Sequence, residues 1–337
     1  MLSRHLSRPG YRLAFASVLF CSVVIALGAF TRLVDAGLGC PDWPLCYGHL
    51  WAPLAEADIQ AANEAWPDFP VDHSITWPEM VHRYVAAILG FMVLGLWWIT
   101  FRNRHLPGQP IKLPILIGLV IVLQAAFGAW TVTLKLWPQV VTAHLLGGFT
   151  TFTLLWLLTL RYSGWQPRQL IQTRGLSLRL GLIVLVMTVI QIALGGWVSS
   201  NYAALACPDF PTCQGYWVYP YGYDVGFDFN QQVGPNYLGG QLDVEGRAAI
   251  HYVHRVGALV LTVLTLLFAW QALRAGLRRL AAVMVGLLAV QIALGIINVV
   301  YAIPLWAATA HNGVAALFLL SVVTLLYRIY REVSYGK

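Results

Sequence analysis

The chain contains the same passage twice. Residues 28–144 recur as residues 195–311, with most matching positions displaced by 167. One recurring group surrounds a pair of cysteines: Cys40, Asp42, Pro44, Cys46 and Gly48 in the first copy, and Cys207, Asp209, Pro211, Cys213 and Gly215 in the second. Another comprises Gln124, Gly128 and His144, repeated as Gln291, Gly295 and His311. We therefore expect two similar structural units.

The units are predicted to lie in a membrane. Of 337 residues, 58% are hydrophobic and 10% charged, whereas soluble domains carry about 25% charged residues. Eight apolar runs have the roughly 20 residues that a helix needs to cross a bilayer. They lie near 13–33, 80–101, 112–134, 140–161, 177–198, 249–271, 279–302 and 306–328. The sequence thus predicts an all-α integral membrane protein with eight transmembrane helices, forming two tandem four-helix bundles over residues 1–165 and 166–337.

Basic residues predict the orientation of these helices. Sixteen of the 21 Lys and Arg residues lie in the N-terminal tail, at 102–112, 161–179 and 274–279, or near the C-terminus. The positive-inside rule places these segments and both termini in the cytoplasm. The long cysteine-containing loops would then be periplasmic, in a protein of the cytoplasmic (inner) membrane. The net charge of +7 reflects this topology and does not indicate a nucleic-acid partner, which would require a clustered basic face.

Four of the nine histidines are candidate haem ligands: His82, His144, His254 and His311. Each is expected within about one turn of the outer start of an even-numbered transmembrane helix. An ionisable group at this depth is costly unless it faces the bundle interior. We expect two pairs, His82 with His144 and His254 with His311, because opposed imidazoles can bind a haem iron from both faces. An interhelical hydrogen bond is the alternative for any single histidine. His5, His49, His73 and His105 are expected to be solvated.

The surroundings of the four histidines favour haem over a small ion. Zinc or copper would call for further Cys or carboxylate ligands at short spacing. Several small residues near the histidines leave room for a planar ligand: Ala143, Gly147, Gly148, Gly257 and Gly313. Arg83 and Arg255 directly follow two of the histidines. They are candidates for contacts with haem propionates and equally for pairing with loop aspartates.

The two copies differ three residues before their first histidine. Glu79 in the first copy aligns with His251 in the second, because His82-Arg83 recurs as His254-Arg255. Residues three apart share a helix face. Glu79 would therefore add a carboxylate beside the first site, suited to proton transfer or charge stabilisation near a reacting substrate, while the second site resembles an electron carrier. The alternative is a carboxylate favoured by the helix dipole.

The cysteines are expected to serve structural or redox roles. Cys21 lies within the first apolar run and is expected to be a packing residue. A disulfide in each outer loop is favoured by the oxidising compartment, either as a structural staple or as a reversible dithiol. The spacing does not fit covalent haem attachment or a zinc finger.

Five segments resemble the haem A synthase family. They are residues 28–48 (GAFTRLVDAGLGCPDWPLCYG), 79–90 (EMVHRYVAAILG), 142–148 (TAHLLGG), 254–258 (HRVGA) and 309–319 (TAHNGVAALFL). The resemblance implies an eight-helix membrane oxidoreductase that converts a ring methyl of haem O, through a hydroxymethyl stage, into the formyl group of haem A for terminal oxidases.

The resemblance also implies site roles. A haem b cofactor would bind His254 and His311 and relay electrons; the substrate haem O would bind His82 and His144, with Glu79 at the family's essential glutamate position. Cys40 and Cys46 match the first-loop pair of some members, and Cys207 and Cys213 match a pair present in fewer. A haem O synthase and an oxidase assembly factor are the implied partners. The electron partner, the oxidant and the oligomeric state, including a homo-oligomer, stay open.

Three other functions are considered from the residues. A diheme b-type cytochrome between quinol and an outer acceptor would explain four histidines but not the difference between Glu79 and His251. A thiol oxidoreductase built on the cysteine pairs would leave the membrane histidines without a role. A transporter made of parallel repeats would be expected to show broken helices at the bilayer midplane, which the pattern does not indicate.

Overall fold

Eight helices of the computed structural model, which describes residues 8–164 and 177–335, are long and apolar enough to cross a membrane. They are α1 (Tyr11–Leu33), α3 (His73–Arg102), α4 (Lys112–Thr133), α5 (Pro138–Tyr162), α6 (Leu178–Ser200), α8 (Val244–Arg274), α9 (Arg278–Val300) and α10 (Leu305–Tyr335). The all-α class and the eight predicted spans are confirmed. Three short helices lie between them: η1 (Ala36–Leu38), α2 (Glu56–Ala65) and α7 (Tyr223–Gly226).

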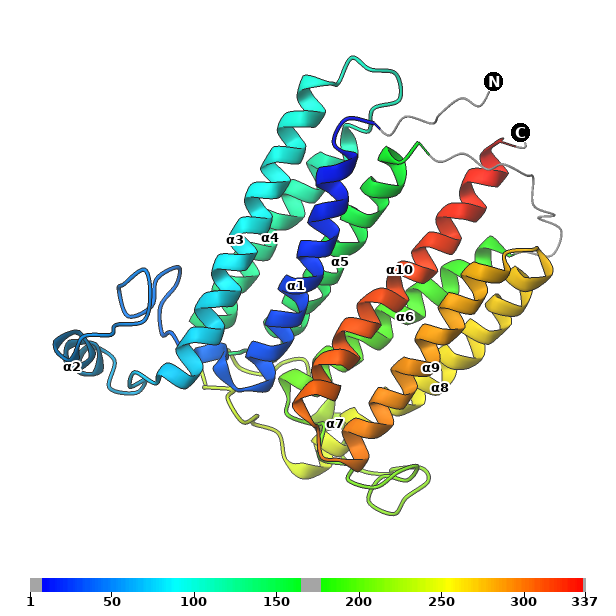
Figure 1. Ribbon diagram of the computed structural model, residues 1–337. Helices are drawn as coiled ribbons and strands as arrows, with labels where there is room; N and C mark the ends of the chain where they lie inside the picture. The colour runs from blue at the N-terminus through cyan, green and yellow to red at the C-terminus, as the bar shows by residue number, and fades with distance from the viewer. Residues whose placement is uncertain (1–7, 165–176, 336–337) are drawn as a thin grey trace.

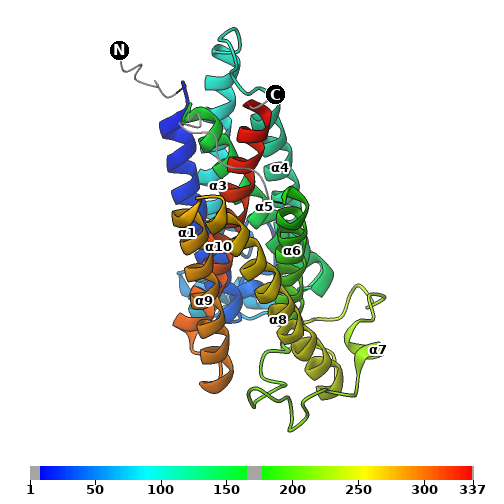
Figure 2. The same cartoon turned by 90° about the vertical axis from the view of Figure 1, so that its right-hand side faces the viewer.

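The helices form two groups in chain order. Figure 1 shows α1, α3, α4 and α5 on one side and α6, α8, α9 and α10 on the other, with both long loops at the end opposite the start of α1. In the perpendicular view, α7 lies to the side of the N-terminal part of α8, and the second long loop extends below it (Figure 2). The predicted boundary at 165/166 lies outside the described residues, as do Arg4, Arg168, Arg174 and Lys337.

The two groups share a packed interior. The buried cluster of the first group includes Ile192 from α6 and Leu319 from α10. Trp156 of α5 donates a hydrogen bond from Nε1 to Thr324 Oγ1 of α10 at 2.7 Å. Cys21, 2% exposed, lies in the same cluster as a free thiol, in agreement with its predicted packing role.

Residues 167 positions apart in the sequence meet at the C-terminal ends of α1 and α6. The Arg32 guanidinium donates to the Ser199 carbonyl at 2.5 Å and lies 4.0 Å from the centre of the Tyr202 ring. Tyr202 donates its hydroxyl hydrogen to Asp35 Oδ1 at 2.8 Å. Both hydrogen-bonded pairs are separated by 167 residues. Such pairs are typical of units related by a twofold axis; an internal duplication stays a prediction from the sequence.

Two helices begin earlier than their apolar runs. Asp72 caps α3 by accepting from the Ser74 N–H, and Asp243 caps α8 by accepting from the Gly246 N–H. These caps satisfy backbone donors before the first apolar turn. His82 and His254 consequently lie more than two turns inside their helices. The expectation that they lie within one turn of the helix start was wrong.

His144 and His311 lie six residues after the first residues of α5 and α10, which is also more than one turn. The prediction that His49 and His105 are exposed to solvent is confirmed. His73 is exposed as well, but it is the first residue of α3 and not part of a loop. His5 lies outside the described residues.

Candidate functional site

Each of the four candidate ligand histidines lies against a glycine of a neighbouring helix. A Cβ at Gly28, Gly128, Gly195 and Gly295 would lie 2.9, 3.3, 3.2 and 3.2 Å from Cε1 of His82, His144, His254 and His311, respectively. Ordinary contact begins at 3.4 Å. The glycines on α1, α4, α6 and α9 therefore allow an imidazole to sit directly on the neighbouring helix backbone.

Three glutamines lie one turn before three of these glycines. The Gln124 amide donates to the His144 carbonyl at 2.6 Å. The Gln191 amide donates to the His254 carbonyl at 2.8 Å, and its Nε2 lies 3.1 Å from His254 Nδ1. Gln291 Nε2 lies 3.2 Å from His311 Nε2. From the sequence, Gln124 and Gln291 could be recognised only as repeated positions, and the contacts of the three glutamines with the histidines were not predicted.

Two glycines near the histidines make room for these amides. A Cβ at Gly147 would lie 2.0 Å from Gln124 Oε1, and a Cβ at Gly257 would lie 2.3 Å from Gln191 Oε1. The space beside them is filled by side chains, so their interpretation as room for a planar ligand was wrong. At Gly313 an added Cβ would meet nothing within 4 Å among the described residues.

The histidines fit the requirements of a haem iron. His82 lies close enough to His144 to interact with it electrostatically, and His254 likewise with His311. All four residues are half-buried. Among the described residues, buried Nδ1 atoms lack a hydrogen-bond partner in His82, His144 and His311. Imidazoles on two helices, with ring nitrogens available, are suitable axial donors. These residues therefore fit one haem in each half.

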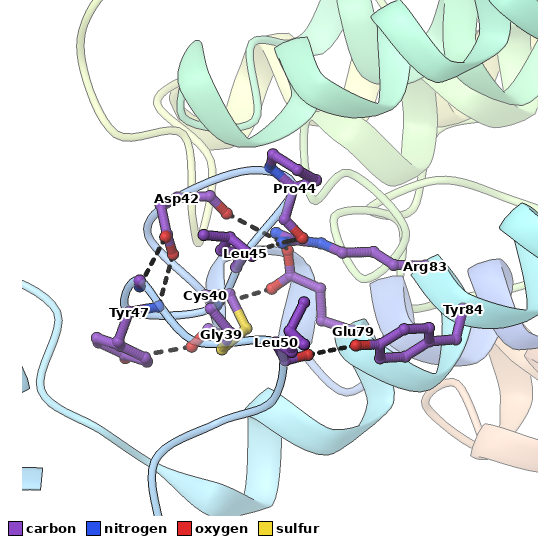
Figure 3. Close-up of a disulfide and its surroundings, with 12 residues drawn as sticks. Gly39, Cys40, Asp42, Pro44, Leu45, Tyr47, Leu50, Glu79, Arg83 and Tyr84 are labelled. Carbon is purple, nitrogen blue, oxygen red and sulfur yellow. Dashed lines mark hydrogen bonds and ion pairs between the residues drawn. A yellow bond between two sulfur atoms is a disulfide. The ribbon is translucent and has the colours of Figure 1, made fainter. Parts of the chain in front are cut away.

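Glu79 lies beneath the first disulfide loop (Figure 3). Its side chain is buried, and the residue is 4% exposed. Oε2 accepts a hydrogen bond from the Cys40 N–H at 2.9 Å, while Oε1 accepts one from Arg83. Arg83 also donates to the carbonyls of Asp42 at 3.0 Å and Leu45 at 2.6 Å. One arginine thus compensates a buried carboxylate and holds the loop above it.

Arg255 holds the second loop in a related way. It donates to the carbonyls of Cys207 at 2.7 Å, Asp209 at 2.8 Å and Thr212 at 2.6 Å. Arg83 and Arg255 therefore contact main-chain carbonyls of the loops and not the aspartate carboxylates considered from the sequence. Propionate contacts by either arginine stay a prediction. The position of the second half that is equivalent to Glu79 is occupied by His251, which is 6% exposed.

Both loops contain the expected disulfide. Cys40 is bonded to Cys46, and Cys207 to Cys213. Each loop also has a cis peptide bond before proline, at Trp43-Pro44 and Phe210-Pro211. The structure thus provides a covalent staple in each loop, and a further redox role for either pair stays a prediction.

An aspartate closes each disulfide loop. Asp42 accepts from the N–H groups of Tyr47 at 2.6 Å and Gly48 at 2.8 Å. Asp209 accepts from those of Gln214 at 2.6 Å and Gly215 at 2.9 Å, and from the Thr212 hydroxyl. Burial raises the pKa of Asp209, but these hydrogen bonds outweigh it and lower the pKa to about 2.

Comparison with known proteins connects this arrangement to a family. The family model COX15-CtaA, described as "Cytochrome oxidase assembly protein", matches residues 11–323. The chain belongs to this family. A "Heme A synthase" from Shewanella oneidensis is 44% identical over 322 residues, covering 94% of this chain and 96% of the relative.

More distant members of the COX15-CtaA family match over similar lengths. A "Heme A synthase" from Methylobacterium sp. (strain 4-46) is 31% identical over 351 residues, covering 94% of this chain and 91% of the relative. One from Paracoccus denitrificans is 28% identical over 333 residues, covering 90% and 84%. The resemblance drawn from the sequence is confirmed at the level of the family.

Proposed function

We propose that this chain is a haem A synthase with two unlike haem sites. It acts in haem A biosynthesis as an oxidoreductase on haem O, as its family membership indicates. The proposed reaction oxidises one ring methyl of haem O, through a hydroxymethyl stage, to the formyl group of haem A. The observation that carries the division of roles is the buried Glu79 carboxylate, which only one of the two histidine-pair sites has.

In the N-terminal half, His82 and His144 are proposed to hold the substrate iron. Their rings are fixed against Gly28 and Gly128, which sets the distance of each imidazole from its neighbouring helix. Glu79 is three residues before His82 and therefore on the same face of α3. The Glu79 carboxylate is therefore proposed to face the ring methyl of haem O on the periplasmic side of the substrate.

The contacts of Glu79 favour its ionised form. The Cys40 N–H and the Arg83 guanidinium both donate to the carboxylate, and donors of this kind stabilise negative charge. Glu79 is therefore proposed to accept a proton, or to stabilise positive charge, during oxidation of the methyl carbon. Arg83 keeps the carboxylate and the disulfide loop in one fixed arrangement during this step.

In the C-terminal half, His254 and His311 are proposed to hold haem b. When bound, this cofactor supplies one-electron transfer. Gln191 and Gln291 orient the two histidines from the neighbouring helices. His251, in place of a glutamate, leaves this site without the carboxylate proposed for the reaction.

Orientation follows from the charge pattern. We place both termini in the cytoplasm and both disulfide loops in the periplasm, in the inner membrane of a bacterium. A haem O synthase is the proposed supplier of substrate, and a terminal oxidase pathway the proposed recipient of product.

The test is the Glu79→Gln variant, produced in cells that make haem O. We expect no haem A from this variant, while its haem B content equals that of wild type, measured by extraction and chromatography. His251→Gln changes the equivalent position of the other half and is the matched control, expected to keep haem A formation. Normal haem A output from Glu79→Gln would refute the role of the carboxylate. Haem B alone in the wild type would favour the diheme cytochrome.

A further inference from the structure

The four helices that precede the ligand histidines share a five-residue pattern. Residues 124–128 read QAAFG, residues 191–195 read QIALG and residues 291–295 read QIALG. The corresponding stretch of α1, residues 24–28, reads VIALG. Each glycine seats a histidine ring. The amide one turn earlier is thus present for three histidines, and Val24 stands in its place for His82.

The amides also differ in what they contact. In the C-terminal half, Gln191 and Gln291 each approach a ring nitrogen, at 3.1 Å in His254 and 3.2 Å in His311. In the N-terminal half, the Gln124 amide donates to the main-chain carbonyl of His144. Both C-terminal rings therefore have a side-chain amide at one ring nitrogen, Nδ1 in His254 and Nε2 in His311, and neither N-terminal ring has such a contact among the described residues.

The residue three positions after each histidine differs between the sites, but an amide reaches a ring nitrogen beside either a glycine or a valine. Gly147 and Gly257 leave space for Gln124 and Gln191 over the main chain. At the same position after His311 the chain has Val314, and there the amide lies at the ring. The residue after His82 in this register is Val85. Position 24 is one turn before Gly28, as Gln191 and Gln291 are one turn before their glycines, so a glutamine there is expected to reach the His82 ring.

An imidazole that binds iron through one nitrogen carries a hydrogen on the other, which it can donate to the amide oxygen of a neighbouring glutamine. Oε1 of Gln191 and Oε1 of Gln291 have no hydrogen-bond partner among the described residues. Hydrogen bonds of this kind fix the orientation of a metal-bound imidazole, and their loss typically lowers metal affinity by about 10- to 100-fold. The two sites of a haem A synthase have opposite needs in this respect. Substrate must enter and product must leave the N-terminal site. The haem b of the C-terminal site must remain bound through every turnover.

We propose that Val24 keeps the haem of the N-terminal site exchangeable, and that Gln191 and Gln291 are positioning residues that retain haem b. The inference rests on the proposed function for the identity of the two haems. It assigns the difference in retention to one side chain on α1 and its two counterparts on α6 and α9. The ligand histidines are the same in both sites.

The test uses the full-length protein in detergent, loaded with haem B and haem O. Haem release to excess apomyoglobin is followed by absorbance, and chromatography of the haem left on the protein shows which site has emptied. We expect Val24→Gln to slow release of haem O and haem A by about 10-fold or more, with haem B release unchanged. Val24→Leu adds comparable bulk without an amide and is the matched control, expected to release haem O like wild type.

The reciprocal variant Gln191→Leu is expected to speed haem B release by about 10-fold or more and to alter the low-spin absorption bands of haem b. Release of haem O from Val24→Gln at the wild-type rate would overturn the inference, and so would unchanged haem B release from Gln191→Leu. Equal slowing by Val24→Leu would assign the effect to bulk and also overturn it. Haem A formation by the wild type is measured in the same preparation. If the wild type forms no haem A but the variants change the release rates as expected, the enzyme assignment is refuted and the difference in haem retention is still supported.

Discussion

Replacing Gly39 by alanine tests whether the disulfide loop must press against α3 to hold Glu79. Gly39 has φ −66° and ψ −25°, a conformation open to any residue. The obstacle is space, because an added Cβ would lie 2.5 Å from the Ile75 carbonyl oxygen and 3.0 Å from the Thr76 nitrogen. Both atoms belong to the backbone and have little freedom to move aside.

The size of the effect follows from these distances. The loop must retreat by about 1 Å to bring the 2.5 Å approach to the 3.4 Å at which ordinary contact begins. The next residue, Cys40, would move with it and lose its 2.9 Å hydrogen bond to Glu79. A hydrogen bond to a charged group contributes about 1.5–3 kcal/mol, so we expect Gly39→Ala to lower the free energy of unfolding by about 2 kcal/mol.

The assay has two readouts. Unfolding in mixed micelles of increasing SDS content, followed by tryptophan fluorescence, gives the change in stability; haem extraction gives haem A output and haem B content. Gly90→Ala is the matched control, because a Cβ at this position of α3 meets nothing within 4 Å among the described residues, and alanine stabilises a helix interior by about 1 kcal/mol. We expect Gly39→Ala to lose haem A output and to keep haem B. A Gly39→Ala protein as stable and active as Gly90→Ala would refute the reasoning.

Three further predictions concern other contacts. Gly28→Ala should displace the His82 ring, whose Cε1 would lie 2.9 Å from the new Cβ, and should reduce haem O binding but not haem B content. Gly195→Ala should reduce haem B content but not haem O binding. If each variant lost both haems equally, the two sites would not be separate. The pKa of Asp209 is lowered to about 2, so its stabilisation of the loop is present above the unfolded pKa of about 3.9 and is lost as pH falls through about 2. Reduction of Cys207–Cys213 by a phosphine should therefore accelerate between about pH 4 and 2, and Asp209→Asn should be reduced faster than wild type at pH 7; a pH-independent rate would exclude this linkage. Tyr202→Phe removes the 2.8 Å hydrogen bond to Asp35 and should lower the free energy of unfolding by about 0.5–1 kcal/mol in the SDS assay, because Asp35 is solvent-exposed; no measurable loss would show that the bond does not help to join the halves.

The sequence predicted the spanning helices well because a bilayer imposes a minimum apolar length. It failed at the starts of α3 and α8, where Asp72 and Asp243 extend the helices into polar sequence. It also gave no indication of α2, which is a polar helix with Glu56 and Asp58 in its first turn. Caps and acidic first turns are the signals that could have located these boundaries.

The site was predicted in part. Repetition singled out the histidines and cysteines, because the same residue types returned at fixed displacement. The contacts of Arg83 and Arg255 with loop carbonyls depend on how the chain folds back over α3 and α8, which no spacing reveals. The pairing of glycines with histidines depends on which helices are neighbours. Alignment of the sequences of α1, α4, α6 and α9 with one another could have shown that Val24 stands where the other three helices have glutamine.

The hydrogen bonds between Arg32 and Ser199 and between Asp35 and Tyr202 have a consequence for how the two sites came to differ. In a symmetric dimer of identical chains, a replacement appears on both sides of the axis at once. Both sites would then carry a glutamate, or neither would. Within one polypeptide, each half can change without the other. A site that retains its haem and a site that releases it can therefore lie on either side of the same interface.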